Sequence, residues 1–214
     1  MGIARLVFAG IGVAAIGAFA YTRYRDTEEP DYDVLFREDK FELRQYAPMI
    51  VAETSHTGDR RRAQSASFRR LASYIFAEDR PEGGEKIDMT APVLQAPAKP
   101  RGDDGEPSPM LQDQTRNGEW RMSFVMPSRY TLATLPEPPA DIELREVPGR
   151  RVASVRFSGV ARESDLLLME ARLSEWIAAQ GYTAVGGYEY GFYDAPTVPG
   201  PLRRNEVMIE VERP

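Results

Sequence analysis

The sequence predicts an α+β fold in which two strands, a helix and two further strands occur in the same order twice. Three observations predict it. Apolar and polar residues alternate in short segments of both halves, as they do in strands that bury one face. Apolar residues recur three and four positions apart over residues 61–77 and 163–180, as on the buried side of a helix. The order of these segments matches between the halves, although few residues are identical.

The first half is expected to contain, in order, strands at 32–37, 41–46 and 49–54, a helix at 61–77, an extended segment at 86–94 and a strand at 120–126. The apolar side of the helix includes Phe68, Leu71 and Ile75. In the last strand the residues two apart share one apolar face, which is formed by Trp120, Met122, Phe124 and Met126.

The second half is expected to contain strands at 142–147 and 151–158, a helix at 163–180, an extended segment at 188–193 and a strand at 205–211. Ser164 is a suitable N-cap for the helix, and Gly181 a suitable C-terminal stop. Two such units can join their sheets into one saddle or distorted antiparallel β-barrel flanked by the two helices. A cleft between the halves is a common place for a ligand.

The N-terminal residues 1–25 predict a hydrophobic helix that acts as a signal anchor or a signal peptide. Residues 6–21 are apolar, and Arg23 and Arg25 follow them, which favours a retained anchor. Ala18-Phe19-Ala20 also fits the small-x-small pattern of a cleavage site, which would give a secreted protein. We expect a linker at 26–31 and a membrane-anchored domain at 32–213 on the extracytoplasmic side, periplasmic in a Gram-negative bacterium.

Composition excludes several classes of site. The chain has 214 residues, a net charge of −6, no cysteine and one histidine, His56. It therefore lacks disulfides, thiolate nucleophiles and thiolate-ligated metals, and one chain cannot supply two histidines to a zinc ion or a haem iron. The negative charge argues against nucleic acid as a partner. We expect a monomeric domain with a long mobile loop at 97–119, which is rich in proline and glycine.

Residues 86–93, Lys-Ile-Asp-Met-Thr-Ala-Pro-Val, closely resemble the signature of the SOUL haem-binding family. Further landmarks of that family resemble residues 41–48, 68–75, 120–127, 157–159, 193–196 and 203–207, in the same order and spacing. The resemblance spans about residues 31 to 213. It implies a pseudo-two-fold α+β domain on a distorted barrel. It also implies non-covalent, non-catalytic binding of haem (b-type) or another porphyrin in an apolar groove.

A porphyrin is a flat apolar disc with two carboxylates, so its site needs apolar and aromatic surface and a basic rim. The residues that can provide these are Phe68, Leu71, Ile75, Lys86, Met89, Met122, Phe124, Met126, Tyr193, Arg203, Arg204 and Glu206. Some family members have a histidine, a possible iron ligand, where this chain has Gln45. The iron is therefore expected to be unligated or held by Tyr or Met.

Glu206 supports two alternatives to a haem carrier, buffer or sensor. A carboxylate at the start of an apolar strand is costly unless it is paired, and a preceding arginine is its expected structural partner. The family is thought to be related to effector-binding domains of multidrug-responsive regulators, which implies that Glu206 could instead bind an amphipathic or cationic ligand. A hydrolase that acts through Glu206 with Tyr190 or Tyr193 is the third hypothesis.

Overall fold

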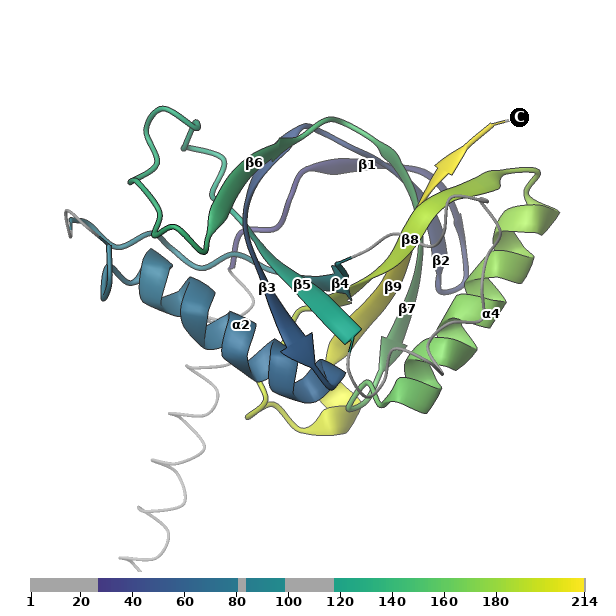
Figure 1. Cartoon of the computed structure of the whole chain (residues 1–214). Helices are drawn as coiled ribbons and strands as arrows, with labels where there is room; N and C mark the ends of the chain where they lie inside the picture. The colour runs from purple at the N-terminus through teal and green to yellow at the C-terminus, as the bar shows by residue number, and fades with distance from the viewer. Residues whose placement is uncertain (1–26, 81–83, 99–117, 214) are drawn as a thin grey trace, which may run out of the picture.

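The computed structural model describes residues 27–80, 84–98 and 118–213, which form one curved sheet with helices on its outer side (Figure 1). The elements in chain order are β1 (Tyr32–Glu38), β2 (Phe41–Tyr46), β3 (Met49–Gly58), α2 (Arg60–Ile75), β4 (Val93–Pro97), β5 (Gly118–Val125), β6 (Glu143–Val147), β7 (Arg151–Ser158), α4 (Glu163–Ala179), β8 (Thr183–Phe192), the short 3₁₀ helix η1 (Gly200–Leu202) and β9 (Arg204–Glu212).

The sheet has nine antiparallel strands in the order β1-β2-β7-β9-β8-β4-β5-β3-β6. Apart from β1 at the edge, this order is symmetric about the central β4–β8 pair. The first strand of each unit pairs with the second strand of the other unit, β2 with β7 and β6 with β3. The two units expected from the sequence are thus interleaved in one sheet.

Each helix covers its own part of the outer face. Helix α2 packs on β3 and β5, and α4 packs on β7, β8 and β9 (Figure 1). Two of the apolar cores lie under these helices, around Leu71 and Leu173 respectively. A third core, which includes Val51 and Met208, faces away from both helices, because neighbouring strand residues point to opposite faces.

Local side-chain and backbone features set the helix boundaries. Asp59 caps α2, since its carboxylate accepts hydrogen bonds from the backbone N–H groups of Arg61 and Arg62, both at 3.1 Å. The expected N-cap of α4, Ser164, is wrong: the helix begins at Glu163, and the following Asp165 accepts a hydrogen bond from the N–H of Arg162. Gly181 follows α4 with a φ of +73°, as expected of a C-terminal glycine.

The expected barrel does not close within the described residues, because no hydrogen-bonded pairing joins the edge strands β1 and β6. Of the extended segment 86–94, only the end belongs to a strand, β4. The hydrophobic segment 1–25 and most of the loop 97–119 lie outside the described residues. Between residues 27 and 213, no described helix is long and apolar enough to span a membrane.

Candidate functional site

A cavity of about 520 Å³ lies beside the first half of α2. Its walls come from α2, from the chain before and within β4, from β5, and from the segment that joins β8 to β9. The lining residues are Arg60, Arg61, Gln64, Ser65, Phe68, Arg69, Met89, Val93, Met122, Val160, Ala161, Phe192, Asp194, Ala195, Pro196, Arg203 and Asn205.

The walls of this cavity expose apolar surface. Phe68 is 38% exposed although it lies on the sheet-facing side of α2, where its ring meets Phe124 edge-on with centroids 5.4 Å apart. Val160 on the opposite side is 47% exposed. Met89 and Phe192 are partly buried between them. Large apolar side chains left open around a hollow are typical of a binding site for an apolar ligand.

Arg60 is a buried cation in the wall of this cavity. Its guanidinium donates to the side-chain oxygen of Gln95 at 3.2 Å and to the carbonyl oxygen of Ala161 at 2.9 Å, and it lies near the Phe192 ring. Within the described chain it forms no ion pair with a carboxylate, and burial lowers the pKa of Arg60. A buried cation without a counter-charge favours an anionic group beside it.

Three further arginines lie around the opening. Arg61 and Arg69 form no ion pair among the described residues, so their charges face solvent at the rim. Arg203 has a different role: its guanidinium donates to the carbonyl oxygens of Val198, at 2.7 Å, and of Pro196. It therefore holds the β8–β9 segment in the shape that forms one wall.

The signature segment 86–93 connects α2 to β4 and brings Met89 to the cavity. The N–H of Ile87 donates to the carbonyl of Ile75 at 2.8 Å, and the hydroxyl of Thr90 donates to the carbonyl of Val125 at 2.6 Å. These bonds fix the segment on both sides of Met89. Lys86 is exposed, with its ammonium 6.0 Å from the Phe76 ring, and does not line the cavity.

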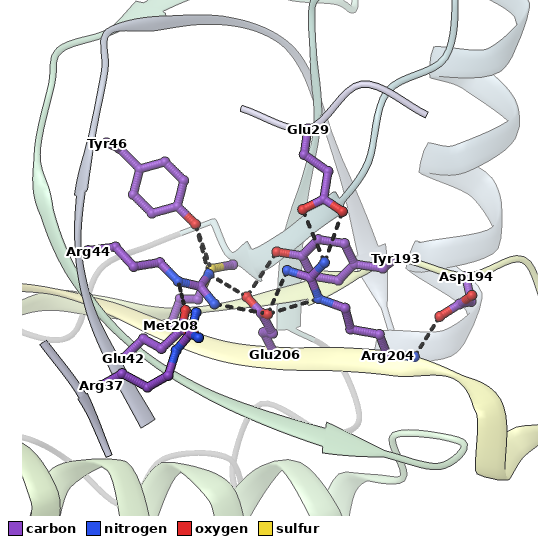
Figure 2. A network of polar contacts seen from close by, with 10 residues as sticks. All are labelled: Glu29, Arg37, Glu42, Arg44, Tyr46, Tyr193, Asp194, Arg204, Glu206 and Met208. Atoms are coloured by element: carbon purple, nitrogen blue, oxygen red, sulfur yellow. Dashed lines mark hydrogen bonds and ion pairs between the residues drawn. The ribbon is translucent and has the colours of Figure 1, made fainter. Parts of the chain in front are cut away.

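A second cluster of charged residues lies in the interior of the curved sheet, around Glu206 (Figure 2). Glu206 is fully buried and accepts two hydrogen bonds from the guanidinium of Arg44, at 2.6 and 3.1 Å. The guanidinium of Arg204, at 2.9 Å, and the hydroxyl of Tyr193, at 2.9 Å, also bind its carboxylate. Arg44 also donates to the hydroxyl of Tyr46 at 3.0 Å.

Further carboxylates balance the two arginines. Glu42 accepts from Arg44 at 2.6 Å, and Glu29 accepts from Arg204 at 2.9 Å. Glu29 belongs to the segment expected as a linker, which also contacts the domain through the hydrogen bond from the N–H of Ala91 to the carbonyl of Glu28. Glu206 therefore already has cationic partners from its own chain.

The electrostatics agree with this geometry. Burial alone would raise the pKa of Glu206, but the hydrogen bonds and charges of Arg44 and Arg204 outweigh it and hold the pKa below its ordinary value. Burial raises the pKa of Tyr46 to about 12. The nearby hollow, lined by Tyr46, Met208 and others, measures only about 20 Å³. Among the described residues, this small hollow lacks the space that a bulky cation needs, and the Glu206 carboxylate is already paired.

The cavity unites four of the residues expected at the site: Phe68, Met89, Met122 and Arg203. The structure places the others elsewhere. Leu71, Ile75, Phe124 and Met126 belong to the core under α2, Lys86 lies outside, and Tyr193, Arg204 and Glu206 belong to the interior cluster. Arg60, Val160 and Phe192 were missed. Arg60 begins the run Arg60-Arg61-Arg62, which the sequence alone indicates as a solvated loop or helix start, and only the fold shows that Arg60 turns inward.

Of the two tyrosines expected for hydrolysis, only Tyr193 lies beside Glu206. Tyr190 donates to Glu170 at 2.6 Å, on the side of the sheet that faces α4, whereas Tyr193 binds Glu206 in the interior. His56 lies 2.9 Å from the hydroxyl of Ser67, but that serine is only 1% exposed and does not line the cavity.

Solved structures of other proteins share this fold. The C-terminal domain of EcmrR matches with a TM-score of 0.60 at 11% identity, over 86% of this chain and 99% of that one. A hydrolase from Listeria innocua matches with a TM-score of 0.55 at 13% identity, over 83% and 94% of the two chains. At these identities the likeness shows the fold alone.

Sequence comparison is more specific. No curated protein matches the chain by sequence. The family model of the SOUL heme-binding protein matches residues 27–210, which is nearly all of the described chain together with the signature segment beside the cavity. The chain belongs to the SOUL heme-binding protein family.

Proposed function

We propose that this protein binds haem or another tetrapyrrole in the cavity beside α2, as a non-catalytic carrier, buffer or sensor. The observation that carries the proposal is the combination of an open apolar cavity with a buried Arg60 in its wall that makes no direct ion pair among the described residues. Membership of the family supports the ligand class.

The residues of the cavity fit a porphyrin. Its volume of about 520 Å³ lies within the usual range for small-molecule sites, about 300–1,000 Å³. Phe68, Met89 and Val160 would contact the apolar disc, while Arg60 and Arg61 would pair with its carboxylates. The chain has no cysteine for a covalent attachment, so the ligand would be held non-covalently.

The cavity offers few side chains that could bind the haem iron. Among its lining residues, the side chains able to bind iron through sulfur are Met89 and Met122, and Met122 is only 1% exposed. Bound haem supplies an iron centre whose reactivity depends on its axial ligand. We infer that Met89 or no protein group occupies that position, which suits storage or transport better than redox catalysis.

A haemin titration followed by the Soret band tests the apolar wall. Phe68→Ser should weaken binding at least tenfold, because it removes an aromatic surface of the cavity. Phe76→Ser is the matched control, since Phe76 is also 38% exposed and follows α2, yet does not line the cavity. Equal affinities of the two variants would contradict the proposed site.

The same titration tests the rim. Arg61→Ala combined with Arg69→Ala should weaken binding and reduce its dependence on salt, because two cations near the ligand carboxylates are lost. Arg62→Ala is the control, because Arg62 is exposed, pairs with Asp59 and does not line the cavity. If the double variant and Arg62→Ala lose affinity for haemin to the same extent, the attraction to positive charge is non-specific and does not depend on the rim of the cavity.

We propose further that residues 1–25 anchor the domain at a membrane, with the domain on the extracytoplasmic side. The apolar run followed by Arg23 and Arg25 supports a retained anchor. The extracytoplasmic side follows the usual behaviour of short N-terminal anchors, because the few basic residues around the run do not determine it. Membrane fractionation of the full chain and of a chain lacking residues 1–25 tests it. Retention of both proteins in the soluble fraction would overturn the anchor.

A further inference from the structure

A second hollow, of about 400 Å³, lies on the opposite flank of the molecule, at the C-terminal end of α4. Figure 1 shows this end of α4 on the same side as β2 and the C-terminus. The hollow is lined by Leu35, Phe36, Leu43, Arg151, Trp176, Gln180, Tyr182 and Arg213. It shares no residue with the cavity beside α2.

One side of this hollow is apolar and partly open. Leu35 and Phe36, on the edge strand β1, are 48% and 45% exposed. The Trp176 ring stacks with Phe36 and with Phe41, at centroid distances of 6.1 and 5.4 Å, and its N–H donates to Glu38 at 2.7 Å. This side therefore presents a fixed aromatic and aliphatic surface.

The other side carries two arginines without counter-charges. The guanidiniums of Arg151 and Arg213 lie 5.8 and 5.5 Å from the centre of the Tyr182 ring. Within the described residues neither arginine forms an ion pair, and the buried Nε–H of Arg151 has no acceptor. Arg213 donates from Nε to the hydroxyl of Tyr182 at 3.2 Å, and its terminal N–H groups have no acceptor among the described residues.

We propose that this hollow binds a small amphipathic organic anion, with its apolar body on Leu35, Phe36 and Trp176 and its carboxylate or phosphate between Arg151 and Arg213. A buried N–H without an acceptor costs free energy, and a ligand oxygen would remove that cost. Paired guanidiniums are well suited to carboxylate and phosphate groups. The proposal does not depend on tetrapyrrole binding in the other cavity.

Three matched probes test this chemistry: dodecanoate, dodecanol, which lacks the charge, and inorganic phosphate, which lacks the chain. Binding to the full-length protein is followed by calorimetry and by tryptophan fluorescence, in which Trp176 lines the hollow and Trp120 is only 1% exposed. We expect saturable binding of dodecanoate below its micellar concentration, and at least tenfold weaker binding of the other two. Dodecanol that binds as tightly as dodecanoate would overturn the role of the arginines.

Variants locate the site. Arg213→Gln and Arg151→Gln should each weaken dodecanoate binding about tenfold, or about 1.4 kcal/mol, because each removes a charge-assisted hydrogen bond to the ligand. Arg172→Gln, on the exposed face of α4, should leave it unchanged. Haemin binding should also be unchanged in both site variants. Unaltered dodecanoate binding by Arg213→Gln and Arg151→Gln would refute the proposal.

Phosphatidylglycerol vesicles distinguish a membrane source from a free ligand. Vesicle binding that requires both Arg151 and Arg213 would assign the site to anionic lipid, whereas binding of dodecanoate alone would assign it to a soluble anion. If neither dodecanoate nor the vesicles bind in a way that depends on these arginines, the proposal is wrong.

Discussion

The side chain of Glu206 is the centre of a cluster of paired charges in the interior of the sheet. Its carboxylate receives hydrogen bonds from Arg44, Arg204 and Tyr193, and it is fully buried. A buried charge is tolerated when its hydrogen-bonding capacity is used in this way. The cluster joins β2 to β9 across β7, so its role in this chain is to hold strands of different units together.

Removal of the negative charge should destabilise the fold. Glu206→Gln leaves the buried Arg44 and the partly buried Arg204 beside a neutral group, and we expect the free energy of unfolding to fall by about 3–5 kcal/mol. Tyr193→Phe removes one hydrogen bond to the same carboxylate and should cost about 1–2 kcal/mol. Urea denaturation at pH 7 measures both. A loss below about 0.5 kcal/mol for Glu206→Gln would show that the cluster contributes little.

Stability should also fall in acid. The pKa values of Glu206 and Glu53 lie below their ordinary values in the folded protein, since arginines bind both carboxylates. The unfolded chain therefore takes up protons first, at about pH 4.3, and stability that is present above this pH is lost as the pH decreases further. Unfolding free energies measured from pH 7 to pH 3 should decline, with a shallower slope for Glu206→Gln. If the unfolding free energies of the unchanged protein and Glu206→Gln decline with equal slopes, Glu206 does not cause the loss of stability in acid.

The sequence could predict only part of this cluster. The position of Glu206 at the start of an apolar strand indicated an arginine partner close in sequence, and the contact with Arg204 confirms it. Arg44 lies 162 residues away, and its contact follows from the order β2-β7-β9. Strand order depends on how both units pack together, and a local pattern does not contain that information.

Helix α2 is the element that positions the proposed tetrapyrrole site. Residues 60–69 of the helix supply six of the lining residues, and the 3.6-residue period places them along one side of the cavity. The helical pattern predicted the apolar side of α2, but Leu71 and Ile75 face the core while Phe68 stays open to the cavity. Periodicity identifies an apolar stripe; it does not show which part of the stripe another element covers.

The start of α2 should therefore affect ligand binding as well as stability. Asp59→Ala removes the N-cap and should cost about 1 kcal/mol of unfolding free energy. Gly181→Ala is the matched control at the end of α4. The φ of +73° at this position disfavours alanine by about 1–2 kcal/mol, and the added Cβ atom would contact no other atom. We expect a lower melting temperature for both variants and weaker haemin binding for Asp59→Ala alone. If Asp59→Ala binds haemin as tightly as the unchanged protein, the N-cap of α2 does not contribute to the binding site.

At the scale of the whole molecule, the two units share one sheet but differ in their surfaces. The sequence predicted the α+β class and the repeated order of elements, and the strand order agrees with two interleaved units. The expected distorted barrel is not confirmed: among the described residues the sheet stays open, because β1 extends one edge and does not pair with β6. The large cavity lies beside α2, whereas the flank of α4 carries a hollow of different composition. We therefore expect one tetrapyrrole per chain despite the pseudo-symmetry.

The most direct test of this account is an NMR titration of the ¹⁵N-labelled protein with the diamagnetic zinc protoporphyrin. We predict saturation at about one equivalent, with backbone shifts confined to residues 60–69 of α2, Met89 and the segment from Phe192 to Asn205. The amides of Tyr46 and Met208, in the interior, should not move. Shifts centred on those interior residues, or on the end of α4, would contradict the proposed site.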